Sequence, residues 1–217
     1  MGRGPVPYHE RPTWRGWLHT AAFAAAIPAG LYLVLVAEHT SARVAAAIYC
    51  ASVLLGFGTS AAYHRLARGI RARRIMQRMD HSMIYVLIAG SYTPVCLLAM
   101  PTAWGITMLS VVWAGALLGV ILKQFAFNRF RAIQYALYPI LGWAAVVSFP
   151  VLITGLSTTE LLLLIAGGVI YTVGIPVLLK ERPDPWPKTF GYHEVWHSCT
   201  VLAALCHFAL VGLLVST

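Results

Sequence analysis

Residues Leu161–Leu179 read LLLLIAGGVIYTVGIPVLL, a run of 19 residues without an Asp, Glu, Lys or Arg. A hydrocarbon core about 30 Å thick requires roughly 20 apolar residues in helical conformation. The run is continuously apolar and lacks the alternation of a barrel strand, so it predicts a membrane-spanning helix. By the same criterion we expect seven spans in all: Trp17–Ala37, Val44–His64, Asp80–Ala99, Trp104–Leu122, Ile133–Ile153, Leu161–Leu179 and His193–Val215.

The composition of the whole chain agrees with this prediction. Of its 217 residues, 59% are hydrophobic and 11% are charged, against roughly 25% charged in an average soluble domain. A soluble fold of this size could not bury so much apolar surface. We therefore exclude a soluble enzyme, a disordered chain and a small secreted domain held together by disulfides. The expected fold is all-α: a polytopic membrane protein built as a seven-transmembrane helix bundle and located in the cell membrane.

The cysteines fit the same interpretation. All four lie inside apolar runs and form no CxxC pair, so we expect buried hydrophobic residues, without a disulfide or a thiolate metal site. They are Cys50, Cys96, Cys199 and Cys206.

The distribution of positive charge predicts the orientation. The chain carries 16 Lys and Arg against 7 Asp and Glu, a formal charge of +9. In a seven-span serpentine, Arg43 alone falls on one side of the membrane. The other cations fall in the N-terminal arm and in alternate loops: Arg3, Arg11, Arg15, Arg65, Arg68, Arg71, Arg73, Arg74, Arg78, Lys123, Arg129, Arg131, Lys180, Arg182 and Lys188. The positive-inside rule then predicts a cytoplasmic N-terminus and an outside C-terminus.

Two consequences follow for partners and organisation. We expect the basic loops, above all the six-arginine second loop, to contact anionic lipid head groups, and we expect no nucleic-acid partner. Residues 1–16 form a basic cytoplasmic arm and residues 17–217 a single membrane domain. A cleaved signal peptide is disfavoured, because Leu18–Val36 has the length of an anchor and exceeds the usual 7–15 apolar residues.

Polar residues converge at the predicted inner ends of three spans. Ser60 and His64 end the second span, Asp80 begins the third, and His193 and His197 begin the seventh. Ionisable residues inside a membrane are costly and need a reason. His193 and His197 are four residues apart, so both imidazoles project from one face of a helix. His64 can supply a third nitrogen from another helix.

Three neutral imidazoles and a water molecule make an open tetrahedral Zn²⁺ site. Asp80 would hydrogen-bond that water, as a general base or as a fourth, water-mediated ligand. Ser60 lies one turn before His64 and could orient the water or a substrate carbonyl. Taken singly, each residue has a plainer explanation: an interfacial histidine often has no special role, and Asp80 could cap the third helix or pair with Arg78. Taken together, they favour a metal site.

Residues His193 to His197 also match H-E-x-x-H, the signature of zinc metalloproteases, with Glu194 as the general base. Downstream of His197 the chain has no carboxylate, and its one histidine is His207. A soluble metalloprotease is therefore excluded. An intramembrane protease with Asp80 as third ligand stays open, but it would leave His64 without a role, so we rank it lower.

The remaining histidines are expected to lie outside the site. We expect no functional role for His9, His19 or His39. His81 points about 100° away from Asp80 on a helix, which suggests packing or indirect support. His207 lies about 15 Å deeper than His197 and is expected to hydrogen-bond within the bundle.

Three motifs resemble the hemolysin III family, bacterial relatives of the adiponectin and progestin receptors. They are Ser60-x-x-x-His64, the segment from Asp80-His81-Ser82-Met83-Ile84-Tyr85 to Ala89-Gly90-Ser91-Tyr92-Thr93-Pro94, and Phe190-Gly191-Tyr192-His193-Glu194-Val195-Trp196-His197. The wider superfamily includes alkaline ceramidases and shares the order Ser-x-x-x-His, Asp, His-x-x-x-His. The resemblance runs from Trp17 over nearly the whole chain and includes Tyr171-Thr172-Val173-Gly174. Ser91 stands where the family pattern has Thr.

The resemblance implies a zinc ion near the inner leaflet, held by His64, His193 and His197, with Asp80 close by through water. It also implies hydrolysis of amide bonds in lipids such as ceramides. The family name implies a cytolytic activity that none of these residues explains, because a permanent seven-span bundle offers no insertable segment.

Two functions remain open. In a zinc-dependent lipid amidohydrolase, zinc would polarise the substrate carbonyl, Asp80 would accept a proton, Ser60 could help to hold the oxyanion, and the apolar interior would take an acyl chain. The alternative is a receptor-like or membrane-homeostasis protein with structural zinc and no turnover. A transporter or channel is disfavoured, because the chain has no inverted repeat.

Overall fold

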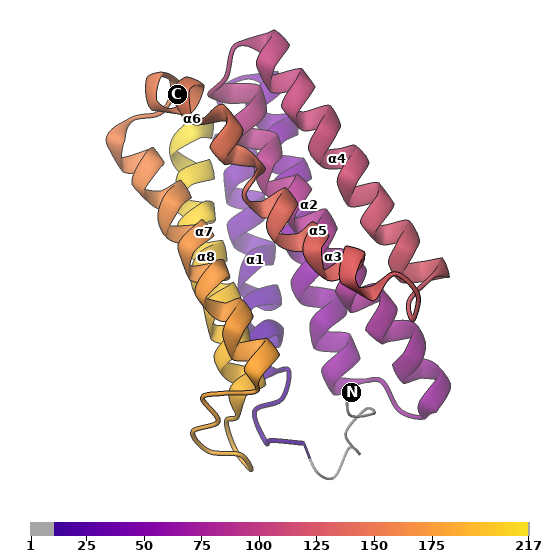
Figure 1. Ribbon diagram of the computed structural model, residues 1–217. Helices are drawn as coiled ribbons and strands as arrows, with labels where there is room; N and C mark the ends of the chain where they lie inside the picture. Colours follow the sequence, from indigo (N-terminus) through magenta and orange to yellow (C-terminus); the bar gives the residue numbers. More distant parts are fainter. Residues whose placement is uncertain (1–10, 217) are drawn as a thin grey trace.

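The computed structural model describes residues 11–216, and within them the chain is a bundle of long helices without a β-strand (Figure 1). Arg3 and His9, with the rest of the arm before Arg11, lie outside the described residues. The elements are α1 (Trp17–Val36), α2 (Thr40–Arg65), α3 (Ile70–Leu98), α4 (Thr102–Phe125), α5 (Arg131–Gly142), η2 (Ala144–Ser148), α6 (Phe149–Gly155), α7 (Thr158–Lys180) and α8 (Tyr192–Val215).

The prediction of seven spans is confirmed. In the described part of the chain, seven segments are long and apolar enough to cross a membrane, the fifth being Arg131–Gly155, which combines α5, η2 and α6. The arm and the α2–α3 and α7–α8 connections lie toward one end of the bundle, and the C-terminus lies at the other (Figure 1). Which end faces the cytoplasm stays a prediction from the charges.

The predicted start of the third span is wrong, because α3 begins at Ile70, ten residues before Asp80. Arg71, Arg73, Arg74 and Arg78 are therefore helical and do not belong to a six-arginine loop. Arg, Met, Gln and Ala are strong helix formers, so the helix continues past the apolar part that hydropathy detects. Asp80 lies inside α3, and its interpretation as a helix cap is wrong as well.

Lys123 was also expected in a loop, and this too is wrong. It lies in the last turns of α4, where its side chain is only 2% exposed. Its ammonium group lies 4.7 Å from the centre of the Tyr135 ring and 5.4–5.5 Å from those of Phe127 and Tyr138. Aromatic faces attract a cation, which allows the residue to be buried at this position.

The fifth span is broken where a continuous helix was expected. The backbone passes from α5 through the 3₁₀ turn η2 into α6, whose second residue is Pro150. Proline has no N–H to donate and clashes with the preceding turn, so it is tolerated at the start of a new helical segment. The Tyr92 hydroxyl donates to the carbonyl of Gly142 at 3.1 Å and accepts from the amide of Ala145 at 2.7 Å. These bonds satisfy backbone groups that the break leaves open, as the membrane interior requires.

Helices adjacent in sequence pack side by side: α1 against α2, α2 against α3, α3 against α4, and α7 against α8. The last helix, α8, also contacts α1, α2 and α3, and so closes the bundle. The α2–α3 contact is close at Gly90, where a Cβ atom would lie 2.1 Å from the Ser52 hydroxyl oxygen. This arrangement brings the last turn of α2, the first turn of α8 and the middle of α3 together at one end of the bundle.

Candidate metal centre

Three histidines from α2 and α8 meet at this end of the bundle. One potential ligand atom from each of His64, His193 and His197 lies within 4.8 Å of the other two. The Nε2 atoms of His64 and His193 are 3.2 Å apart. His64 and His197 are buried, with 5% and 2% of their surface exposed. The convergence expected from the order of the spans is therefore present in the fold.

The three side chains fit a metal ion. In a tetrahedral zinc site with metal–nitrogen bonds of 2.0–2.1 Å, neighbouring nitrogens are about 3.3 Å apart, close to the separation of the His64 and His193 atoms. Nδ1 of His197 is buried and has no hydrogen-bond partner among the described residues. A buried polar atom left unsatisfied costs about 1–3 kcal/mol, so the fold maintains a nitrogen-rich cluster at an energetic cost. Imidazole nitrogens are ligands that first-row divalent ions favour.

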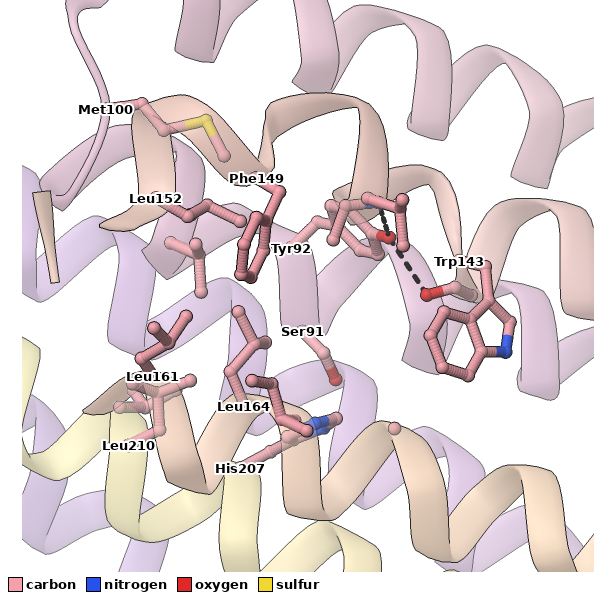
Figure 2. Close-up of a pocket in the computed structure, with 17 residues that line it drawn as sticks. Ser91, Tyr92, Met100, Trp143, Phe149, Leu152, Leu161, Leu164, His207 and Leu210 are labelled. Atoms are coloured by element: carbon pink, nitrogen blue, oxygen red, sulfur yellow. Dashed lines mark hydrogen bonds between the residues drawn. The ribbon is translucent and has the colours of Figure 1, made fainter. Parts of the chain in front are cut away.

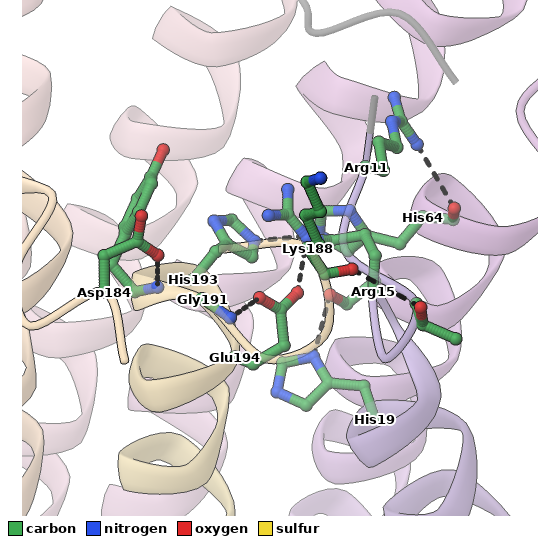
Figure 3. A network of polar contacts seen from close by, with 12 residues as sticks. Arg11, Arg15, His19, His64, Asp184, Lys188, Gly191, His193 and Glu194 are labelled. Atoms are coloured by element: carbon green, nitrogen blue, oxygen red, sulfur yellow. Dashed lines mark hydrogen bonds and ion pairs between the residues drawn. The ribbon is translucent and has the colours of Figure 1, made fainter. Parts of the chain in front are cut away.

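Glu194 determines where α8 begins, and it thereby places both histidines of that helix. Its Oε2 atom accepts a hydrogen bond from the amide of Gly191 at 2.9 Å, which caps the first turn. Its Oε1 atom is 2.5 Å from Nε of Arg15, and the Glu194 side chain is fully buried (Figure 3). Both carboxylate oxygens of Glu194 thus form contacts within the protein, which argues against Glu194 as a general base. The residue that joins the α8 pair is His64, which argues against the H-E-x-x-H interpretation.

Asp80 and Ser60 lie beside the cluster on neighbouring helices. Asp80 of α3 lies within reach of a side-chain hydrogen bond with Ser60 of α2, which is buried. Arg78, considered above as a partner for Asp80, donates instead to the carbonyl of Gln124 at 3.1 Å and lies over the ring of Phe127. The serine–aspartate contact joins α2 to α3 next to the three imidazoles.

His19 of α1 lies against the same cluster, so the expectation that it lies outside the site is wrong. It is only 6% exposed, and its ring stacks on His197 with centroids 3.7 Å apart and planes 10° apart. Its Nδ1 atom is 2.8 Å from the Ser60 hydroxyl, and its Nε2 atom is 2.8 Å from the hydroxyl of Thr200 on α8. A sequence signal existed: His19 is the third residue of α1, at the end of the bundle where the other histidines were expected.

The described part of the arm lies across this end of the bundle (Figure 3). The amide of Thr13 donates to the carbonyl of Lys188 at 3.1 Å, and a guanidinium nitrogen of Arg11 donates to the carbonyl of His64 at 3.2 Å. Gly16 has a φ of +83°, and a Cβ atom there would lie 2.6 Å from Cβ of His64. Only glycine suits both the left-handed backbone and this close approach.

The other described histidines lie outside the cluster. His39 caps the opposite end of α2, where its Nδ1 atom accepts from the amide of Ala42 at 3.1 Å. His81 stacks on Phe127, consistent with the packing role expected of it. His207 lies against Gly167 of α7, and its Nε2 atom has no hydrogen-bond partner among the described residues.

An apolar cavity of about 120 Å³ lies deeper in the bundle, between α3, the broken fifth span, α7 and α8 (Figure 2). Its lining includes Tyr92, Phe149, Leu164, His207 and Leu210. His207 is ten residues beyond His197 on α8, which places this part of the cavity about 15 Å from the histidine cluster along the helix. The interior therefore offers apolar space at a distance spanned by part of an acyl chain.

Known proteins resemble this chain over nearly its full length. A family profile described as "Haemolysin-III related" matches residues 8–208. The chain is similar to "Hemolysin-3 homolog" of Bacillus subtilis (strain 168), with 32% identity over 183 residues and 83% of each chain covered. It is also similar to "Hemolysin-3" of Bacillus cereus, with 34% identity over 174 residues, 79% of this chain and 76% of the relative. "Progestin and adipoQ receptor-like protein 1" of Caenorhabditis elegans is 27% identical over 188 residues, 76% of this chain and 42% of that relative.

Proposed function

The chain belongs to the haemolysin-III related family of multi-pass membrane proteins, and we propose that it is a zinc-dependent hydrolase of lipid amide bonds. The observation that carries the proposal is the cluster of His64, His193 and His197, with Asp80 and Ser60 beside it. When bound to the three imidazoles, zinc would supply Lewis-acid polarisation of a carbonyl and a source of nucleophile from water at neutral pH.

The side chains of the protein have separate tasks in this proposal. Asp80 accepts the proton of the attacking water, since both oxygens of the other candidate base, Glu194, are engaged by Arg15 and the Gly191 amide. Ser60 was expected to orient water or to hold the oxyanion. Its contacts are Asp80 and His19, so we propose that it acts on Asp80.

The proposed substrate is a ceramide-like lipid amide drawn from the membrane. Its acyl chain would occupy the apolar cavity lined by Phe149, Leu164 and Leu210. A concave, mostly apolar cavity with a few polar groups is the usual form of a small-molecule site.

We also propose a contact with anionic lipid head groups. Arg71, Arg74 and Arg78 lie within about 60° of one another around α3, at 100° per residue. Together with Ile70 and Ile75 they line a shallow groove. Alternating cationic and apolar side chains suit the boundary between head groups and acyl chains.

A receptor-like protein with a structural metal is the second candidate. The Caenorhabditis elegans relative named as a receptor-like protein favours it, as does the way His64 and His197 would tie α2 to α8. In this candidate the metal stabilises the bundle and no lipid is hydrolysed.

Metal content of detergent-purified protein is the first test. Wild type and the His39→Ala control should carry about one zinc per chain, and His64→Ala and His197→Ala should carry none. A well-folded wild type without metal would refute the proposal. Metal retained in His64→Ala but lost in His197→Ala would restore the H-E-x-x-H interpretation.

Turnover then separates the two candidates. Asp80→Asn should keep its zinc and lose hydrolysis of a ceramide by about 10²-fold or more. If zinc-loaded wild type hydrolyses no lipid amide, and His197→Ala lowers the yield of folded protein, the structural-metal candidate is correct.

A further inference from the structure

We propose that His19 is a positioning residue of this centre: it directs the hydroxyl hydrogen of Ser60 and holds the ring of His197 in place. The inference rests on the proposed function, because the task assigned to Ser60 concerns the proton that Asp80 accepts. It concerns a residue of α1, which contributes neither a metal ligand nor the proposed base.

The contacts of His19 leave its ring a single orientation. Both ring nitrogens are 2.8 Å from hydroxyl oxygens, Nδ1 from Ser60 on α2 and Nε2 from Thr200 on α8. One ring face lies on the imidazole of His197, 3.7 Å away and nearly parallel. Phe57 lies 5.0 Å from the ring centroid at a tilt of 48°. His19 therefore joins α1, α2 and α8 at the cluster.

The hydrogen bond of Thr200 decides the direction of the others. The Thr200 hydroxyl donates its single hydrogen to the carbonyl of His197 at 2.8 Å. Toward His19 it is therefore an acceptor, and Nε2 of His19 carries the donated hydrogen. A neutral imidazole then has a lone pair on Nδ1, so the Ser60 hydroxyl donates to His19.

This assignment gives Ser60 a defined part beside Asp80. With its single hydrogen directed to His19, the Ser60 oxygen presents only lone pairs to the carboxyl group of Asp80. In the proposed reaction the water gives up a proton and Asp80 takes it. The resulting carboxylic acid can then donate that proton in a hydrogen bond to Ser60. His19 thus makes Asp80 a better proton acceptor without touching the substrate.

The stacking contact has a separate consequence for metal binding. Groups that orient a metal-binding histidine typically change metal affinity or activity by 10–100-fold when they are removed. In this cluster the closest ring contact of His197 is the face of His19, and Nδ1 of His197 has no hydrogen-bond partner among the described residues. Removing the imidazole should therefore weaken metal binding, whether or not the contact to Ser60 is kept.

Two amide substitutions separate the functions of the ring nitrogens. His19→Asn places an amide near the position of Nδ1 and keeps an acceptor for Ser60. His19→Gln places one near Nε2, keeps the donor to Thr200 and loses the contact to Ser60. We expect His19→Asn to keep kcat within about 3-fold of wild type, and His19→Gln and His19→Ala to lose about 10–100-fold in kcat with KM little changed. The His39→Ala control should match wild type.

Two readouts do not depend on turnover. Co²⁺ affinity, measured from its absorption spectrum in the protein, should fall about 10-fold in His19→Ala and stay unchanged in His39→Ala. The infrared carboxylate stretch of Asp80, identified by its loss in Asp80→Asn, should shift in His19→Gln and stay in place in His19→Asn.

The proposal is overturned if His19→Gln matches wild type while His19→Asn does not, because Thr200 alone would then matter. It is also overturned if His19→Asn and His19→Gln fail equally, with equal loss of folded protein, since the residue would then be a packing element only. If wild type proves to have no hydrolase activity, the proposed function fails, while the Co²⁺ and infrared measurements still decide the role of His19.

Discussion

Replacing Glu194 by Gln distinguishes a structural carboxylate from a catalytic one. The Glu194 side chain is fully buried, one oxygen bonded to the Gly191 amide and the other 2.5 Å from Arg15, whose own side chain is 14% exposed. Breaking a buried ion pair costs about 3–5 kcal/mol, because a charge is left without a partner. Since Gln keeps an acceptor for one of the two donors, and Arg15 is partly exposed, we expect a loss of about 3 kcal/mol in the free energy of unfolding.

The chain contains a matched control for this substitution. Glu160 accepts from the amide and the hydroxyl of Ser157 at 2.7 Å, caps α7 in the same way, and forms no ion pair among the described residues. Glu160→Gln should therefore show the capping cost alone, about 1 kcal/mol. The difference between the two variants isolates the interaction of Glu194 with Arg15.

The assay is reversible unfolding in mixed micelles, with hydrolysis measured per bound zinc. Glu194→Gln should unfold more easily and yet retain turnover per zinc within about 3-fold, as expected for a residue that is not the general base. In a cycle with Arg15→Met, the two substitutions should couple by about 1–3 kcal/mol. A variant with wild-type stability, full zinc and no turnover would refute this reasoning and identify Glu194 as the base.

Three further outcomes are expected. Gly16→Ala should destabilise the protein by about 1–3 kcal/mol and weaken metal binding, because the added Cβ meets His64. Unchanged metal affinity in this variant would contradict the contact. The amount of phosphatidylglycerol that copurifies with the protein should fall in the triple variant Arg71→Ala, Arg74→Ala, Arg78→Ala and stay unchanged in Arg43→Ala. An unchanged lipid content in the triple variant would refute the proposed contact with head groups. Gly168 lines the cavity, and a Cβ atom there would have no atom within 4 Å. Gly168→Leu should therefore lower kcat/KM by about 10-fold for a long-chain ceramide and leave that for a short-chain ceramide unchanged. Equal effects on both substrates would place the acyl chain elsewhere.

The spans were accessible to sequence reasoning because the bilayer imposes one length and one polarity on every helix that crosses it. The meeting of His64 with His193 and His197 followed from the same constraint, since alternate connections of a serpentine lie on the same side. The start of α3 did not follow. Hydropathy detects where a segment becomes apolar, whereas a helix continues for as long as its backbone is well bonded, and Ile70–Met79 continues it on polar residues.

The roles of individual polar residues were less accessible. Asp80 was expected near the histidines and was also considered as a helix cap. The second interpretation was wrong because the start of α3, ten residues earlier, was unknown. His19 was passed over, because a single histidine in an apolar helix carries no spacing signal. Its meaning depends on Ser60 and Thr200, which are 41 and 181 residues away in the chain.

Composition and periodicity thus specify an all-α membrane bundle with seven spans, and the serpentine order of its helices brings three histidines to one end. Only tertiary packing shows that Glu194 is committed to Arg15 and Gly191, that the fifth span is broken, and that His19 lies against His197. The physical reason is that hydrophobic burial and backbone hydrogen bonding act along each segment and leave a pattern in its residues. The partner of a buried polar group, in contrast, is decided by whichever side chain the neighbouring helices bring within about 3 Å.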